Sequence, residues 1–92
     1  MIVEFHPDVK NKDLKNVDFT VKNFFIKAID KIKQHPDVWK SLKSPLWSFK
    51  KVYFFNKKWR IVYKFDGKRV YVIAVWKREN KLVYKNALKR IL

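Results

Sequence analysis

The sequence predicts an α+β domain, in which a small, mostly antiparallel sheet carries N-terminal helices and a C-terminal helix. Three observations lead to this prediction. An amphipathic helical pattern occupies the first half, aromatic and β-branched segments separated by turn residues follow, and a second amphipathic pattern closes the chain. One sheet with helices packed on it is an α+β arrangement. With 92 residues, the chain is expected to form a single domain over residues 1–92.

The first half begins with a short predicted strand at residues 2–5, followed by a polar stretch, 8–16, that suits either a short helix or a loop. The helix that follows is capped by Asp18 or Thr20 and stops before Pro36. Its apolar positions recur at helical spacing and define one face. They are Val21, Phe24, Phe25, Ala28, Ile29 and Ile32. Residues 37–46 are expected to form a connector able to hold a helical turn.

The second half reads as a meander of three antiparallel strands and a helix. The strands are predicted at residues 47–55, 58–65 and 69–77. Asn56-Lys57 is expected to turn the first pair and Asp66-Gly67 the second. Residues 81–92 then follow a helical pattern whose apolar side is formed by Tyr84, Ala87, Leu88 and Ile91.

We expect the long helix to cover one face of the sheet and to leave the other face free, concave and basic. Alternation places Arg60 and Val62 on the face opposite Ile61. A two-residue turn would put Arg60 and Arg78 on opposite faces. A three-residue loop with Gly67 in the left-handed position would put both arginines on one face together with Val70, Val72, Ala74 and Trp76, and so would a break in the strand before Arg78.

The charge is strongly positive and unevenly distributed. The chain has 23 Lys and Arg against 8 Asp and Glu, a net charge of +15. Residues 1–46 hold nine basic and six acidic residues, or +3, whereas residues 47–92 hold fourteen and two, or +12. Such a field typically serves phosphate contacts with nucleic acid, although a lysine-rich, high-temperature host would also enrich lysine.

Several classes of protein do not fit the sequence. The chain has no cysteine, which excludes a disulfide framework and favours a reducing, cytoplasmic setting. No stretch is long enough to span a bilayer, and the N-terminus lacks the pattern of a signal peptide. Neither His6 nor His35 has a second ligand at zinc-like spacing, so we expect no metal and no cofactor.

Three short motifs in the second half resemble those of RelE-type toxins in the RelE/ParE superfamily. They are Trp59-Arg60-Ile61-Val62-Tyr63, Lys77-Arg78-Glu79, and Val83-Tyr84 followed by Ala87-Leu88-Lys89-Arg90-Ile91-Leu92. The resemblance extends in layout over residues 17–92. It implies a toxin of a type II toxin–antitoxin system, silenced by an acidic antitoxin that wraps it. It further implies a metal-independent endoribonuclease that cuts mRNA in the ribosomal A site.

In such a toxin, the 2′-hydroxyl of a nucleotide attacks the adjacent phosphate, so the site needs a base, an acid and cations. By resemblance, Tyr84 stands at the position of the proposed base and Arg78 at that of the acid or phosphate ligand. Arg60 and Lys51 match the basic residues of the family's strands. Tyr53 and Asn80 stand where members of the family carry further basic residues. The expected RNA-binding lysines are Lys50, Lys57, Lys58, Lys77, Lys81, Lys85 and Lys89.

Other interpretations of these residues stay open. Tyr84 suits a helix face packed in a core as well as a catalytic role, and the lysines suit a solvated surface. Two other functions also fit the sequence. One is a ParE-like toxin that poisons DNA gyrase, and the other is a basic RNA-binding module without chemistry.

Overall fold

The computed structural model describes residues 2–42, 49–77 and 82–91, and within these ranges five strands form one sheet in the order β1-β5-β4-β3-β2. The elements follow the chain as β1 Ile2–Phe5, the π-helical turn η1 Val9–Asp13, α1 Phe19–Gln34, β2 Lys40–Ser41, β3 Lys50–Phe54, β4 Trp59–Phe65, β5 Arg69–Lys77 and α2 Leu82–Ile91. Only β1 pairs in parallel, with β5. The α+β prediction is confirmed, and the sheet is larger than expected.

The additional strand is β2, and it corrects the expectation for residues 37–46. Lys40 and Ser41 pair antiparallel with Lys51 and Lys50 of β3, so this part of the connector is extended and forms no helical turn. The remainder of that connector, and the start of the strand predicted at residue 47, lie outside the described residues.

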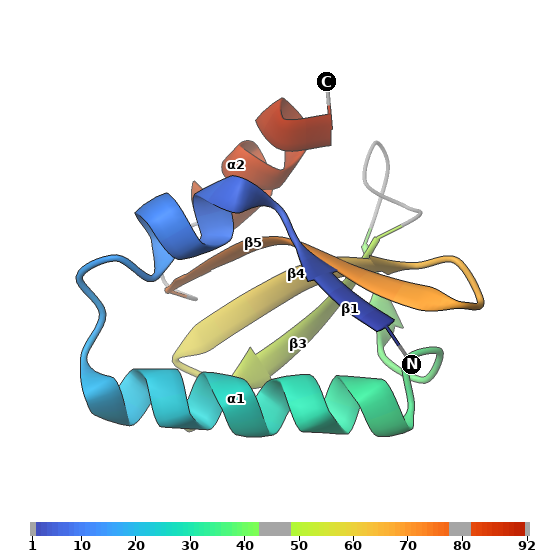
Figure 1. Cartoon of the computed structure of the whole chain (residues 1–92), viewed down its shortest axis with the longest axis horizontal. Helices are drawn as coiled ribbons and strands as arrows, with labels where there is room; N and C mark the ends of the chain where they lie inside the picture. The colour runs from blue at the N-terminus through green and yellow to red at the C-terminus, as the bar shows by residue number, and fades with distance from the viewer. Residues whose placement is uncertain (1, 43–48, 78–81, 92) are drawn as a thin grey trace.

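The long helix α1 covers one face of the sheet, as predicted (Figure 1). Asp18 is its N-cap residue, although its side chain makes no capping hydrogen bond. Five of the six predicted core positions are buried, whereas Phe24 lies at the edge of the face and packs its ring 5.0 Å from that of Phe55. The sheet contributes the other half of this core, through Ile61 and Tyr63 among others. The Tyr63 hydroxyl donates a 2.6 Å hydrogen bond to the carbonyl of Pro36, which ties the connector after α1 to β4.

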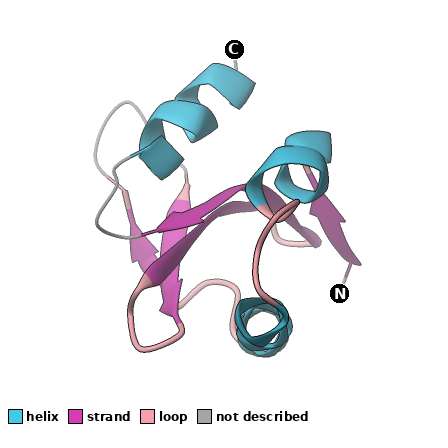
Figure 2. Ribbon diagram, turned by 90° about the vertical axis from the view of Figure 1, so that its left-hand side faces the viewer, coloured by secondary structure: helices cyan, strands magenta, loops and turns pink. Residues whose placement is uncertain are grey.

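The face of the sheet opposite α1 is not free. The expectation of a free, concave and basic face was therefore wrong. Figure 2 shows α2 on the side of the sheet away from α1, with η1 beside it. Ala87 of α2 is completely buried against a cluster that includes Phe49, Val62 and Ile73. The apolar residues of a ten-residue helix cover this face because the alternate side chains of β4 and β5 are also apolar.

A bulge in β5 decides which residues share this face. Three residues, 66–68, lie between β4 and β5, and Phe65 pairs with Val70, so the loop has the length of the three-residue alternative but not its register. Gly67 does adopt a positive φ of 93°, as expected. Farther along, Tyr63 pairs with Val72 but Val62 pairs with Ala74, and β5 therefore contains one extra residue, Ile73.

Because of the extra residue, the alternation of side chains between the two faces of the sheet shifts by one position at Ile73. Val70 and Val72 lie in the core beneath α1, not on the face of Arg60, so that part of the prediction was wrong. Beyond the bulge, Ala74 and Trp76 face α2 as predicted, and Trp76 lies directly opposite Arg60. The bulge at Ile73 is an irregularity of the strand before residue 78, and the face taken by Arg78 stays a prediction. Arg78 itself lies outside the described residues.

The β3–β4 turn is centred on Asn56-Lys57, as predicted. Phe54 pairs with Trp59, and in the loop of four residues between them the Lys58 N–H donates a 3.0 Å hydrogen bond to the carbonyl of Phe55. Phe55, Asn56 and Lys57 all have positive φ, at 52°, 55° and 62°. The left-handed conformation is unfavourable for residues that have a Cβ. Contacts such as that between the rings of Phe55 and Phe24 offset this cost.

The described residues contain no helix long and apolar enough to cross a membrane. They also contain no group of three or more His, Cys, Asp or Glu side chains that could hold a metal ion.

Candidate functional site

Arg60 is the centre of the candidate site, and the sheet register determines where it points. It lies near the start of β4, directly opposite Tyr53 of β3 and Trp76 of β5. Residues paired across a sheet share a face. All three side chains are therefore on the α2 side, as predicted for Arg60 from alternation along the strand.

Arg60 is held between two aromatic rings. Its guanidinium carbon lies 4.9 Å from the ring centroid of Tyr84 and 5.4 Å from that of Tyr53. Both distances are within the range for attraction between a cation and the face of a ring. Tyr84 comes from α2 and Tyr53 from β3, so the arginine joins elements on either side of it.

Arg60 is buried, and no carboxylate of the described residues pairs with its guanidinium. The residue is 9% exposed, and its Nε has no hydrogen-bond partner among the described residues. None of the ion pairs formed by those residues involves Arg60. A buried charge without a counterion is costly, and a guanidinium presents a planar fork of donors suited to phosphate. The chemistry of Arg60 therefore suits contact with an anion.

Lys51 joins the same cluster. It pairs with Val62, which places it on the α2 side of β3, and its Nζ lies 5.4 Å from the ring centroid of Tyr53. Tyr53 thus contacts both cations of the strands. By resemblance, members of the family carry another basic residue at the position of Tyr53. In this chain the Tyr53 ring instead contacts two cations, Lys51 and Arg60.

Tyr84 is both a packed residue and a residue of the site. Its ring belongs to the partly buried side chains around the cluster of Phe49, Val62 and Ala87, and the same ring faces the guanidinium of Arg60. The core interpretation and the functional interpretation of Tyr84 are therefore compatible, because packing fixes the ring where the cation lies.

A buried ion pair holds α2 in this position. Arg90 Nη1 and Nη2 donate to the two carboxylate oxygens of Asp13 at 2.7 and 2.8 Å, and Nη1 also donates to the carbonyl of Ile73 at 2.8 Å. Asp13 Oδ2 in turn accepts the Val75 N–H at 2.9 Å. The hydrogen bond from the Asp13 side chain raises the pKa of Arg90 further, although burial opposes it. The pair thus connects η1, α2 and the bulged segment of β5.

Asp13 and Arg90 were missed as positioning residues at the sequence level. They stand 77 positions apart, and no spacing rule links an aspartate in a polar stretch to an arginine of a distant helix. The role of Tyr53 was missed for a different reason. Only the register of β3 on β4 shows that its ring lies against Arg60.

The predicted RNA-binding lysines that the structure describes lie on different elements and faces. Lys50 belongs to the other face of β3, and its Nζ donates to the carbonyl of Trp39 at 3.0 Å. Lys77 pairs with Trp59 and is exposed at the end of β5. Four more are exposed in the turn after β3 or on α2, namely Lys57, Lys58, Lys85 and Lys89. Lys81, like the predicted catalytic Arg78, lies outside the described residues.

Comparison with known proteins adds to this geometry. The model of the family described as "ParE toxin of type II toxin-antitoxin system, parDE" matches residues 3–82. A comparison with curated protein sequences finds no match.

Solved structures share the fold over nearly the whole chain. A mutant of the E. coli toxin RelE in the free state is 24% identical, with a TM-score of 0.79 over 99% of this chain and 97% of that chain. A mutant RelE in complex with an antitoxin RelBc peptide is 26% identical, with a TM-score of 0.71 over 99% and 97% of the two chains. The toxin–antitoxin complex RelBE from E. coli is also similar, at 18% identity and a TM-score of 0.70 over 86% and 98%.

Proposed function

Because this chain belongs to the ParE toxin family of type II toxin–antitoxin systems, in the RelE/ParE superfamily, we propose that it is a toxin that cleaves mRNA on the ribosome. The observation that carries the proposal is the buried Arg60, whose guanidinium contacts the rings of Tyr53 and Tyr84 and pairs with no carboxylate in the part of the chain that the structure describes. An RNA phosphate supplies the missing anion. The ribosome and its mRNA are then the partners, and the cytoplasm is the place of action.

The reaction is a transesterification that needs no metal ion. The 2′-oxygen of one nucleotide attacks the adjacent phosphorus and the bond from phosphorus to the 5′-oxygen breaks. The products are a 2′,3′-cyclic phosphate and a 5′-hydroxyl end. Tyr84 takes the proton of the 2′-hydroxyl, and Arg78 protonates the leaving 5′-oxygen. Arg60 and Lys51 neutralise the charge that builds up on the phosphate in the transition state.

The geometry supports these roles for three of the four residues. Lys51, Arg60 and Tyr84 come from β3, β4 and α2, and the ring of Tyr53 contacts both cations. The other predicted lysines belong to residues 47–92, whose net charge is +12. They attract RNA through contacts with its phosphates and through the release of counterions. They are Lys57, Lys58, Lys77, Lys81, Lys85 and Lys89, together with Lys50.

The antitoxin is an acidic protein that covers this face. The similarity to RelE bound to an antitoxin peptide, and to the RelBE complex, supports a partner of this kind. The net charge of +15 also favours an acidic partner. Such a partner would neutralise the field that attracts RNA.

The test uses translating ribosomes programmed with a defined mRNA. The purified chain is added, and the mRNA ends are mapped by primer extension for the wild type and Arg78→Ala. New A-site ends that carry 2′,3′-cyclic phosphate in the wild type, and that are lost in the variant, are the expected result. An mRNA that stays uncut by a folded protein would contradict the proposal.

A second candidate function is favoured by the family match itself, whose description names the ParE toxin. A toxin of that kind poisons DNA gyrase and would leave mRNA intact. A gyrase supercoiling assay separates the two. Inhibition that persists in Arg60→Ala, together with intact mRNA, would establish the gyrase-poisoning function in place of RNA cleavage.

A further inference from the structure

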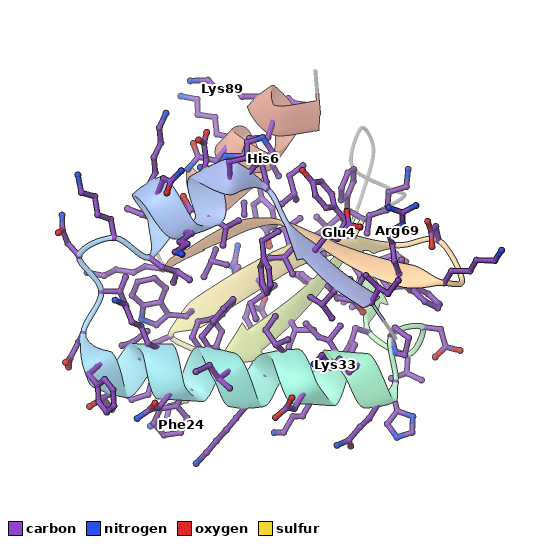
Figure 3. All side chains as sticks on the ribbon, in the orientation of Figure 1. Glu4, His6, Phe24, Lys33, Arg69 and Lys89 are labelled. Carbon is purple, nitrogen blue, oxygen red and sulfur yellow. The ribbon has the colours of Figure 1, made fainter. Side chains whose placement is uncertain are left out.

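A cleft of about 460 Å³ opens between η1, β5 and α2, outside the cluster of Arg60 and Tyr84. His6 and residues of η1 form one wall, and Trp76 of β5 and residues of α2 form the other. Figure 3 labels His6 and Lys89 and shows both on the side of the sheet away from α1. The volume is within the usual range for small-ligand sites, roughly 300–1,000 Å³.

The carboxylates that line the cleft are already paired. Asp13 is bonded to Arg90, and Asp8 Oδ2 lies 3.6 Å from Arg90 Nε and 3.7 Å from Lys12 Nζ. The lining of the cleft includes three cations, Lys12, Lys89 and Arg90, and these two carboxylates. Its net charge is therefore +1 when His6 is neutral. One phosphodiester, with one negative charge, balances that excess.

Several polar side chains that line the cleft can contact a ligand. Lys89 is exposed on α2, with no ion pair among the described residues, and Asn86 lies one turn before it. His6 Nδ1 accepts a 3.1 Å hydrogen bond from the Asp8 N–H, so the neutral ring carries its proton on Nε2 and can donate it. These groups combine a charge for a phosphate with donors and an acceptor for the edge of a base.

The aromatic wall is Trp76, which is half-buried and held by an edge contact with Trp59 at a centroid distance of 6.4 Å. An indole fixed in this way is a surface on which a nucleobase stacks. Trp76 also pairs directly with Arg60 across the sheet. Neighbouring strands are roughly 5 Å apart, and the cleft therefore begins one strand away from the candidate cleavage site.

We propose that this cleft binds one nucleotide of single-stranded RNA next to the cleavage site, with the base against Trp76 and the phosphate at Lys89. The inference rests on the proposed function, because it takes RNA as the ligand. Tyr84 and Asn86 are two positions apart on α2 and point about 200° apart around the helix. The RNA would thus contact α2 on two sides, with the cleaved phosphate on one side and the bound nucleotide on the other.

The experiment measures binding of a fluorescent 12-nucleotide single-stranded RNA by anisotropy, at fixed salt and without ribosomes. The full chain carries Tyr84→Phe, so that the RNA stays intact. The cleft variant adds Asn86→Ala and Lys89→Ala. Its matched control adds Asn23→Ala and Lys33→Ala, which remove the same side chains from exposed positions of α1, on the opposite side of the sheet.

We expect the cleft variant to bind about tenfold more weakly and the control to change about twofold or less, since a stacked, phosphate-bound nucleotide contributes on that scale. Trp76→Leu should weaken binding similarly, whereas Trp76→Phe, which keeps a ring, should retain most of it. Equal losses in the cleft variant and the control would overturn the proposal, because the general positive field would then explain the binding. Unchanged binding in both would overturn it too.

Two further arms identify the ligand. RNA containing 4-thiouridine should crosslink to peptides that contain His6 or Trp76, and crosslinks confined to α1 would contradict the proposal. A free mononucleotide that binds as tightly as the RNA would reassign the cleft to free nucleotides. These results do not depend on ribosomal cleavage, so an inactive chain that binds in the cleft would refute only the proposed function.

Discussion

The guanidinium carbon of Arg60 lies 4.9 Å from the centroid of the Tyr84 ring, and this contact joins the sheet to α2. Arg60 is also nine-tenths buried, without a carboxylate among the described residues. An apolar side chain of similar volume at this position would often give equal or greater stability of the fold. Under the proposed function, an RNA phosphate is the anion that accounts for this buried cation.

Replacing the buried cation should separate stability from activity. In Arg60→Met, we expect the free energy of unfolding to stay equal or to rise by about 1 kcal/mol, because a buried charge is removed and the volume is kept. Cleavage on ribosomes should fall at least about 100-fold, since charge stabilisation of the phosphate is lost. Urea unfolding and single-turnover cleavage measure the two effects. A stable variant with wild-type cleavage would show that Arg60 has no part in the reaction.

The ion pair between Asp13 and Arg90 should be a main determinant of stability. In Asp13→Asn, a buried guanidinium loses its counterion, and we expect the free energy of unfolding to fall by about 3–5 kcal/mol. The half-exposed partner offers a control. Asp8 lies 3.6 Å from Arg90 Nε, and Asp8→Asn should cost about 1 kcal/mol or less. Equal losses in the two variants would refute the special role of Asp13.

Tyr63 should make the fold sensitive to alkaline pH. Burial, and then the negative charge of Asp37, raises the pKa of the Tyr63 hydroxyl well above its ordinary value. In the unfolded chain a tyrosine ionises near pH 10, so the unfolded state loses its proton first. Stability is therefore fully present below about pH 10 and is lost as pH rises above it.

Tyr63→Phe isolates this effect from the titration of the lysines. Near neutrality the variant should be about 1 kcal/mol less stable, because the Pro36 carbonyl loses its hydrogen bond. Between pH 9 and 11, roughly the range in which free tyrosine titrates, the stability of the wild type should fall more steeply than that of the variant. Parallel curves from urea unfolding at each pH would contradict the prediction.

The left-handed turn after β3 offers a stabilising substitution. Lys57 has a φ of 62°, and glycine adopts that conformation without steric cost. We expect Lys57→Gly to raise the free energy of unfolding by about 1 kcal/mol. Lys58, which follows, is not among the residues with positive φ, so Lys58→Gly should be neutral or destabilising. Thermal unfolding of both variants checks this, and a loss of stability in Lys57→Gly would contradict it.

The main elements of the fold could be predicted from periodicity, because burial on one face repeats at 3.6 residues in helices and at two in strands. The buried residues of α1 and the alternation of Arg60 and Ile61 followed directly from that pattern. The bulge at Ile73 could not be predicted in the same way. The Ile73 carbonyl accepts a hydrogen bond from Arg90, and the nearby Val75 N–H donates to Asp13, so the bulge is held by residues from opposite ends of the chain.

The candidate site was predictable to a similar extent. Resemblance named Lys51, Arg60 and Tyr84, and the structure brings all three together. The contact of Tyr53 with Arg60 depends on the register of two strands, which local sequence does not determine. The short strand β2 was missed because two residues are too few for any alternation to be recognised.

The most direct test of the proposed function is the rate of single-turnover mRNA cleavage on programmed ribosomes for Tyr84→Phe, compared with Tyr71→Phe. Both variants lose one phenolic oxygen from a half-buried tyrosine beside the same apolar cluster, but only Tyr84 lies against Arg60. If Tyr84 is the base, its variant should cleave about 10²–10⁴-fold more slowly, while Tyr71→Phe cleaves like the wild type. Equal rates in all three proteins would contradict the catalytic assignment of Tyr84.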